Sequence, residues 1–171
     1  MFKILSEKPQ DAATIEILLD ECFGKDRFTK TVYTVRKNLF PIWELSLVAR
    51  SDEGELLASI RYWPLLVGNM HDAILLGPIA VQPSHQGEGI GVALIRYSME
   101  QAKKLGHKRV ILVGDPEYYE RFGFVSAADL GLELPGPVER RRFLIAPLEE
   151  GALDGVSGMV SGNPAAEMMR G

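Results

Sequence analysis

A glycine-rich turn constrains this chain more than any other feature. Gln86-Gly87-Glu88-Gly89-Ile90-Gly91 follows an apolar, β-prone stretch at 73–81 and opens a segment of helical periodicity at 89–106. The first N–H groups of a helix have no intrahelical partners, and the helix dipole places partial positive charge there. Glycines let the backbone approach a bound anion because no Cβ intervenes. The turn therefore predicts a phosphate-binding site whose geometry fits a diphosphate.

The spacing of these glycines argues against two common phosphate-binding motifs. A dinucleotide fingerprint needs a third glycine three residues after the second, and that position is Val92 or Leu94 here. A P-loop needs Gly-Lys-Ser/Thr at the end of the turn, but Val92 and Ala93 follow the glycines. The remaining pattern is Gln86-x-x-Gly89-x-Gly91 between a strand and a helix, which we call the glycine motif.

The segments around the glycine motif predict alternating strands and helices. A turn at 51–54 containing Gly54 favours antiparallel pairing of its flanking strands, and the next strand extends them into a three-strand meander. The strand 73–81, the helix and the strand 109–113 form a βαβ-like unit, which favours a parallel pair. We expect strands at 2–5, 45–49, 55–67, 73–81, 109–113, 124–125 and 143–146, and helices at 9–23, 29–40, 89–106 and 116–122.

Length and charge narrow the class of protein. The 171 residues suit a single domain spanning 1–171, with an irregular, Gly/Pro-rich C-terminal segment from about residue 130. A net charge of −4 gives no global attraction to nucleic acid or anionic lipid. The run 140–142, Arg-Arg-Arg, is expected to be a solvated face or a local ion-pair partner. We expect a cytoplasmic protein, because the N-terminus is charged too early for a signal peptide and no apolar run is long enough to span a membrane.

Cysteine and histidine usage predicts neither a disulfide nor a metal site. Cys22 is the lone cysteine, and its place in a helical apolar pattern predicts a small buried side chain. His71, His85 and His107 lie in separate segments without the paired spacing of zinc ligands. We therefore expect no metal.

A second motif, Tyr119-x-x-x-Gly123-Phe124, follows the strand 109–113. Together, the glycine motif and this tyrosine motif closely resemble those of the GNAT superfamily of N-acetyltransferases. The segments 114–124 and 151–158 look like the YhbS-like bacterial branch of that superfamily. The resemblance implies an α/β (α+β) fold, with a mixed, mostly antiparallel central sheet flanked by helices and a parallel strand pair at the acetyl-CoA site.

The same resemblance implies an activity. It predicts an N-acetyltransferase that moves the acetyl group of acetyl-coenzyme A (acetyl-CoA), its cosubstrate, to a primary amine by direct attack in a ternary complex. Three kinds of acceptor stay open: the amine of a small molecule, of a peptide or of a protein. A homodimer is compatible with a sheet that has open edges. Glu88 is expected to turn its side chain to solvent. The residues expected to bind the cofactor are Ile79, Ala80, Val81, Gln86, Gly87, Glu88, Gly89, Ile90 and Gly91.

Tyr119 is the candidate catalytic residue, because a phenol holds a proton at neutral pH that the departing thiolate needs. A purely packing role for Tyr119 is the alternative. The general base stays open: many relatives place a glutamate on the strand before the glycine motif, but 73–81 contains none. Glu44, Asp72 and Glu117 are alternatives. The missing glutamate also motivates a second hypothesis, a catalytically silent GNAT-fold module that binds acyl-CoA or a protein partner as a sensor.

Overall fold

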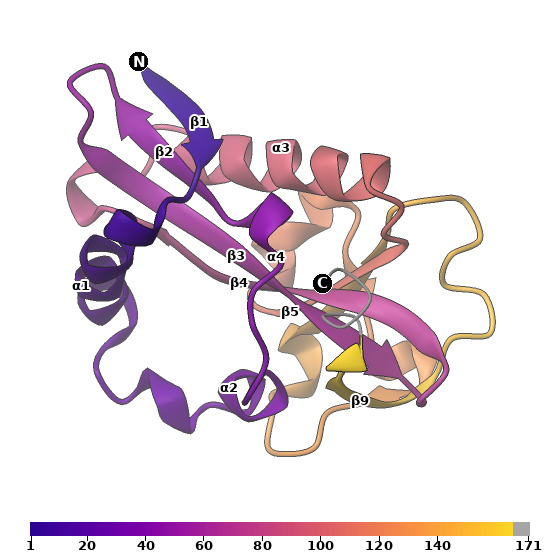
Figure 1. The fold of residues 1–171 in the computed structure, drawn as a ribbon. Helices are drawn as coiled ribbons and strands as arrows, with labels where there is room; N and C mark the ends of the chain where they lie inside the picture. The colour runs from indigo at the N-terminus through magenta and orange to yellow at the C-terminus, as the bar shows by residue number, and fades with distance from the viewer. Residues whose placement is uncertain (166–171) are drawn as a thin grey trace.

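The computed structural model describes residues 1–165 of the chain (Figure 1). The helices are α1 (Ala12–Phe23), α2 (Thr31–Val35), α3 (Ile90–Lys104) and α4 (Pro116–Tyr119), and short 3₁₀ turns flank several of them. The strands are β1 (Phe2–Ser6), β2 (Leu47–Ser51), β3 (Leu56–Val67), β4 (His71–Val81), β5 (Arg109–Val113), β6 (Val125–Ser126), β7 (Leu132–Glu133), β8 (Phe143–Pro147) and β9 (Gly158–Gly162).

The strands form a mixed sheet in the order β1-β2-β3-β4-β5-β8-β6, with β9 pairing β3 and β7 off this path. The pairs along the main path are antiparallel except for β4 and β5, which confirms the predicted parallel pair. The meander β2-β3-β4 is also confirmed. Its first turn places Gly54 at a φ of 88°, a left-handed conformation that favours glycine.

The helices lie on both faces of the sheet: α3 runs along one face, whereas α1 and α2 lie on the other (Figure 1). Ile15, Leu18 and Leu19 repeat at helical spacing and bury one stripe of α1 against β2, β3 and β4. On α3, buried Leu94 and Ile95 pack into the larger core cluster. The helix α3 is tied to the sheet because the hydroxyls of Tyr62 and Ser98 are hydrogen bonded at 2.7 Å.

The prediction of a helix at 29–40 is wrong in extent, because α2 covers only Thr31–Val35. Asn38 adopts a left-handed φ of 66°, which breaks the helical path. Thr31, Val32, Thr34 and Val35 are β-branched and have weak helix propensity. Leu39 still packs against the core cluster that contains Val35. The apolar pattern therefore indicates which side chains are buried, but not how long the helix is.

The expected strand in the C-terminal region is present as β8, but β7 and β9 were missed. The strand β9 begins and ends with glycine, a residue that weakens the sequence signal for a strand. Gly162 is needed for close packing, because an added Cβ would lie 2.9 Å from Leu39 Cδ1 and from the Val35 carbonyl oxygen. The strand β9 therefore pairs with the end of β3 (Figure 1) and packs against the end of α2 at Val35.

The parallel strands β4 and β5 are paired over a short stretch and then diverge. Direct pairing joins Ile74 to Val110 and Leu75 to Ile111, whereas β4 continues to Val81. The β3–β4 register shifts between Ile60 and Tyr62, where β4 carries an irregularity. Beyond Leu75, β4 thus has a partner on its β3 side and an open edge towards β5. No helix in residues 1–165 combines the length and apolar character that crossing a membrane requires.

Candidate active site

The glycine motif forms the N-terminus of α3. Gly87 and Gly89 have φ values of 86° and 84°, so both occupy the left-handed region. An added Cβ at either position meets no atom within 4 Å, so backbone conformation rather than crowding requires these glycines. The N-cap position, Gly89, supplies no side chain to the first amides of α3. These amides are therefore available to an anion, as the sequence predicts.

A cleft of about 580 Å³ lies between this helix end, the end of β4 and α4. All the predicted cofactor residues except Glu88 line it. Glu88 is exposed, and its carboxylate lies 3.2 Å from His85 Nδ1. Sequence reasoning did not identify Arg121, whose guanidinium also lines the cleft and stacks over Tyr118. The residues lining the cleft are Cys22, Phe23, Ile79, Ala80, Val81, His85, Gln86, Gly87, Gly89, Ile90, Gly91, Val92, Ile95, Tyr118, Tyr119 and Arg121.

The backbone groups at the end of β4 alternate between β3 and the cleft. The N–H of Gln82 donates to Leu57 on β3, so Gln82 and Ala80 direct their backbone groups to β3. Ile79 and Val81 therefore direct theirs to the open edge. The Val81 carbonyl accordingly accepts hydrogen bonds from Gln86 Nε2, at 3.2 Å, and from Cys22 Sγ, at 3.4 Å.

Cys22 is only partly buried, contrary to the prediction that its side chain is buried, because it lies at the wall of the cleft rather than in the core. Burial nevertheless raises the pKa of its thiol. The thiol thus keeps its proton and donates a hydrogen bond to the Val81 carbonyl oxygen. It is a poor nucleophile in this setting.

A second cavity, of about 610 Å³, lies on the other side of the open edge of β4 and is called the acceptor cavity below. It shares Phe23, Ile79, Tyr118 and Tyr119 with the cleft, so the two spaces meet at these residues. Its remaining walls come from the α1–α2 region, from the ends of β4 and β5, and from a loop before β8. They are Arg27, Thr29, Lys30, Thr31, Val32, Tyr33, Arg36, Leu75, Leu76, Gly77, Pro78, Leu112, Val113, Gly114, Asp115, Pro137, Val138, Glu139 and Arg142.

Tyr119 packs against Gly114, the residue that follows β5. Gly114 packs so closely that an added Cβ would lie 2.4 Å from Tyr119 Cε2. The absence of a side chain at Gly114 makes room for the ring. Burial, with smaller contributions from Tyr118 and Asp115, raises the pKa of Tyr119 to about 12. The phenol is therefore a proton donor throughout the physiological range.

None of the three predicted base candidates lines either cavity. Glu117 is exposed and paired with Arg141, Asp72 lies near the start of β4, and Glu44 lies in the turn before β2. Among residues 1–165, the carboxylates that line the acceptor cavity are Asp115 and Glu139. Asp115 was missed, although its place between the end of a strand and the helix that carries Tyr119 marks the edge of the site.

The arginine run at 140–142 forms local ion pairs, one of the two expected roles. Arg140 contacts Asp129, Arg141 contacts Glu117, and Arg142 Nε lies 3.4 Å from Asp115 Oδ1. Within the described part of the chain, no group of three His, Cys, Asp or Glu side chains is placed to hold a metal ion.

The model of the acetyltransferase (GNAT) family matches residues 12–124. The N-acetyltransferase YhbS of Escherichia coli (strain K12) is 33% identical over 155 residues, covering 90% of this chain and 92% of its own. The crystal structure of E. coli YhbS in complex with CoA is similar at a TM-score of 0.82, with 30% identity over 97% of this chain and 92% of that one. A GNAT acetyltransferase from Brucella melitensis in complex with acetyl-CoA gives a TM-score of 0.69, with 29% identity over 97% and 98% of the two chains. With the family match spanning most of the chain and the glycine motif at the start of α3, the chain belongs to the GNAT family of N-acetyltransferases.

Proposed function

We propose that this chain transfers the acetyl group of acetyl-CoA to a primary amine by direct attack in a ternary complex. The observation that carries the proposal is the meeting of two cavities at Ile79 and Tyr119. The cleft at the glycine motif suits a phosphate-bearing cosubstrate, whereas the acceptor cavity leads an amine to the same point. An attack without an acyl-enzyme agrees with a Cys22 thiol that stays protonated.

The residues of the cleft fit CoA. The left-handed Gly87 and Gly89 and the uncapped amides of α3 suit its diphosphate, and Arg121 adds a positive charge to the same wall. The open edge of β4 at Ile79 and Val81 suits the amides of the pantetheine arm. The arm would hydrogen bond to this edge in the way that an added β-strand does.

Bound acetyl-CoA supplies an activated thioester carbonyl. The N–H of Ile79 points to the open edge and would donate a hydrogen bond to the carbonyl oxygen. Tyr119 would donate a proton to the sulfur that leaves, a role that contributes about 10²- to 10⁴-fold. Asp115 and Glu139 would attract the ammonium form of the amine, whose pKa near 10.4 makes proton removal necessary. The nitrogen of an ammonium acceptor loses two protons. The first leaves to solvent before the attack, and the second, released from nitrogen after the attack, replaces the proton that Tyr119 gives to sulfur.

Thermal unfolding with acetyl-CoA tests the binding half of the proposal. At 100 times its dissociation constant a ligand adds about 2.7 kcal/mol, which corresponds to a rise of roughly 5–11 °C for a chain of this size. NAD should give no rise. Gly89→Ala should weaken the acetyl-CoA response, because its Cβ enters the space in front of the α3 amides.

Gly54→Ala is the matched control. Gly54 has a φ of 88°, close to the 84° of Gly89, and its added Cβ also meets no atom within 4 Å. Both variants should lose similar stability from backbone strain, but Gly54→Ala should keep the full response to acetyl-CoA. Equal responses in the two variants, or no response in the parent chain, would contradict the cofactor assignment.

Release of free CoA thiol in the presence of amines tests the catalytic half. Amine-dependent thiol release with acetylated amine as the second product supports the transferase. Binding of acetyl-CoA without turnover of any small amine, peptide or protein amine would instead support the catalytically silent sensor.

A further inference from the structure

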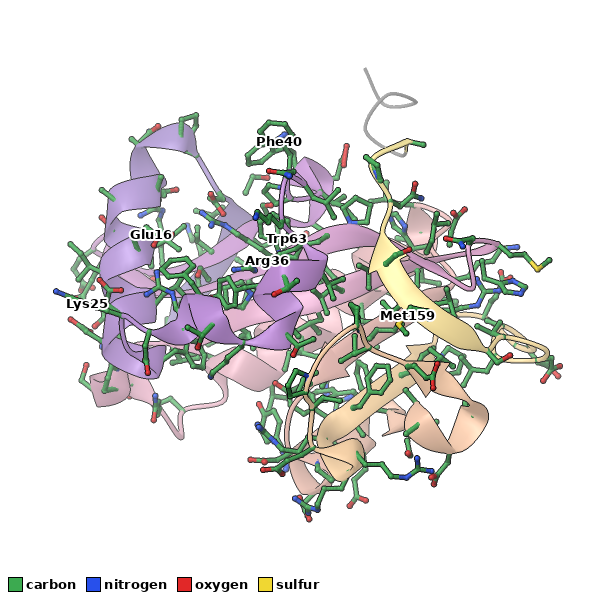
Figure 2. The ribbon with its side chains drawn as sticks, turned by 90° about the horizontal axis from the view of Figure 1, so that it is seen from below. Glu16, Lys25, Arg36, Phe40, Trp63 and Met159 are labelled. Atoms are coloured by element: carbon green, nitrogen blue, oxygen red, sulfur yellow. The ribbon has the colours of Figure 1, made fainter. Side chains whose placement is uncertain are left out.

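Arg36, the residue after α2, is fixed between two aromatic rings. Its guanidinium lies 3.8 Å from the ring centroid of Tyr33 and 4.4 Å from that of Trp63. Its Nη1 donates to the Gly77 carbonyl at 3.2 Å, and Trp63 Nε1 donates to the same oxygen. Figure 2 shows Arg36 and Trp63 lying together between α2 and the sheet. A stacked guanidinium of this kind is preorganised to bind a planar anion.

In the part of the chain that the structure describes, no carboxylate lies within ion-pair distance of this guanidinium, and Glu16 acts on it only as a more distant charge. The other arginines of the acceptor cavity are neutralised: Arg27 contacts Glu16 and Asp20, and Arg142 contacts Asp115. Arg36 lines the cavity, half-buried, without an Asp or Glu at ion-pair distance. A partly desolvated charge without a counter-ion is costly, so it indicates that a ligand completes the pair.

Arg36 also lies close to the point where acetyl transfer would occur. The carbonyl it contacts belongs to Gly77, two residues before Ile79 on β4, which is at most about 7 Å along an extended strand. Tyr119 and Asp115 line the same cavity. A small molecule thus has room to place its amine near Tyr119 and an anionic group on Arg36.

We propose, building on the proposed transferase function, that the acceptor is a small amine that carries a carboxylate, and that Arg36 determines this specificity by binding the carboxylate. One planar guanidinium matches the two oxygens of a carboxylate in a bidentate pair. A phosphate dianion is disfavoured, because Glu139 lines the same cavity and would repel the additional charge.

Matched pairs of amines test the proposal. The panel contains α-amino acids and ω-amino acids of increasing length, each paired with its own carboxamide, together with simple alkylamines. Thiol release and mass spectrometry of the acetylated amine give kcat/KM for each. We expect at least one acid to be acetylated, with kcat/KM at least tenfold above that of its carboxamide.

Two variants assign this preference to Arg36. Arg36→Gln removes the charge, so the acid-to-amide ratio should fall to about one, mainly through KM for the acid, whereas Arg36→Lys should restore part of it. Lys37→Gln is the control, because Lys37 is the next cation in sequence but does not line the acceptor cavity. Its ratio should stay at the parent value. An unchanged midpoint shift with acetyl-CoA in each variant shows that the fold and the cofactor site are intact.

Several outcomes would overturn the proposal. The proposal is contradicted if carboxamides or alkylamines are acetylated with the same kcat/KM as the acids. It is also contradicted if only peptide or protein amines are acetylated. An acid preference that survives Arg36→Gln would assign the specificity elsewhere. Failure of the whole panel in a protein that binds acetyl-CoA counts against the carboxylate acceptor alone, whereas failure to bind acetyl-CoA removes the transferase assignment itself.

Discussion

At the scale of single residues, the neighbouring tyrosines of α4 have different surroundings. The Tyr119 ring fills the space left by Gly114, whereas the Tyr118 hydroxyl lies 3.4 Å from the position of a Cβ on Gly91, in the glycine motif. Tyr119→Phe should lower kcat by about 10²- to 10⁴-fold with little change in acetyl-CoA binding, because only the proton donor is lost.

Tyr118→Phe is the control for that substitution. It removes the neighbouring hydroxyl, which lies by the diphosphate site, so it should weaken acetyl-CoA binding more than it lowers kcat. A reversed result, with kcat lost in Tyr118→Phe and kept in Tyr119→Phe, would transfer the role of general acid to Tyr118 and leave Tyr119 with a packing role.

The raised pKa of Tyr119 predicts an unusual titration. Its ordinary value of 10.0 rises to about 12 in the folded chain because burial disfavours the phenolate. The stability that the neutral ring contributes is therefore complete below pH 10 and is lost as the pH rises towards 12. Phenolate absorbance, compared between the parent chain and Tyr119→Phe, should show the missing group ionising above about pH 11. A difference centred at pH 10 would contradict the assignment.

At the scale of elements, Arg27 connects α1 to the segment that leads to α2. It is 2% exposed, contacts Glu16 and Asp20 on α1, and donates to the Gly24 carbonyl. Arg27→Met should cost about 2–3 kcal/mol, at the lower end for a broken buried pair because the two carboxylates can hydrate. The unfolding midpoint should fall by roughly 4–12 °C.

Arg140→Met provides the comparison for Arg27→Met. Arg140 pairs with Asp129, but both side chains are about 70% exposed. Its loss should change stability by less than about 1 kcal/mol, since solvent screens such pairs. Similar melting midpoints for the two variants would show that Arg27 does not hold the α1–α2 connection.

Local patterns also decide which elements the sequence predicts well. The strand 109–113 and the helix at 90–104 are set by their own apolar spacing and glycine boundaries, so both were placed closely. Beyond the end of α2, Leu39 packs beside Gly162, a contact between segments more than a hundred residues apart. Periodicity within a short window carries no information about such contacts.

At the scale of the whole molecule, the cleft and the acceptor cavity differ in how far apart in the sequence their residues lie. The cleft is built largely from one continuous stretch, 79–92, so a local pattern could indicate most of its lining, whereas Cys22, Tyr118 and Arg121 come from other parts of the chain. The binding role of these residues stays a prediction. The acceptor cavity gathers Arg36, Gly77, Asp115 and Glu139 from separate parts of the chain, so only the fold brings them together. The expected homodimer stays a prediction.

Together with the proposed function, the separation of β4 from β5 predicts a limit on the length of the acyl group. Because the cleft and the acceptor cavity share Ile79 and Tyr119, the acyl chain has no compartment of its own beyond that junction. In the proposed complex an acetyl group would end there, whereas each further methylene would extend into the volume that the amine must occupy. A longer acyl group would therefore occupy the space that the amine needs. The gap between β4 and β5 would thus restrict the enzyme to short acyl groups.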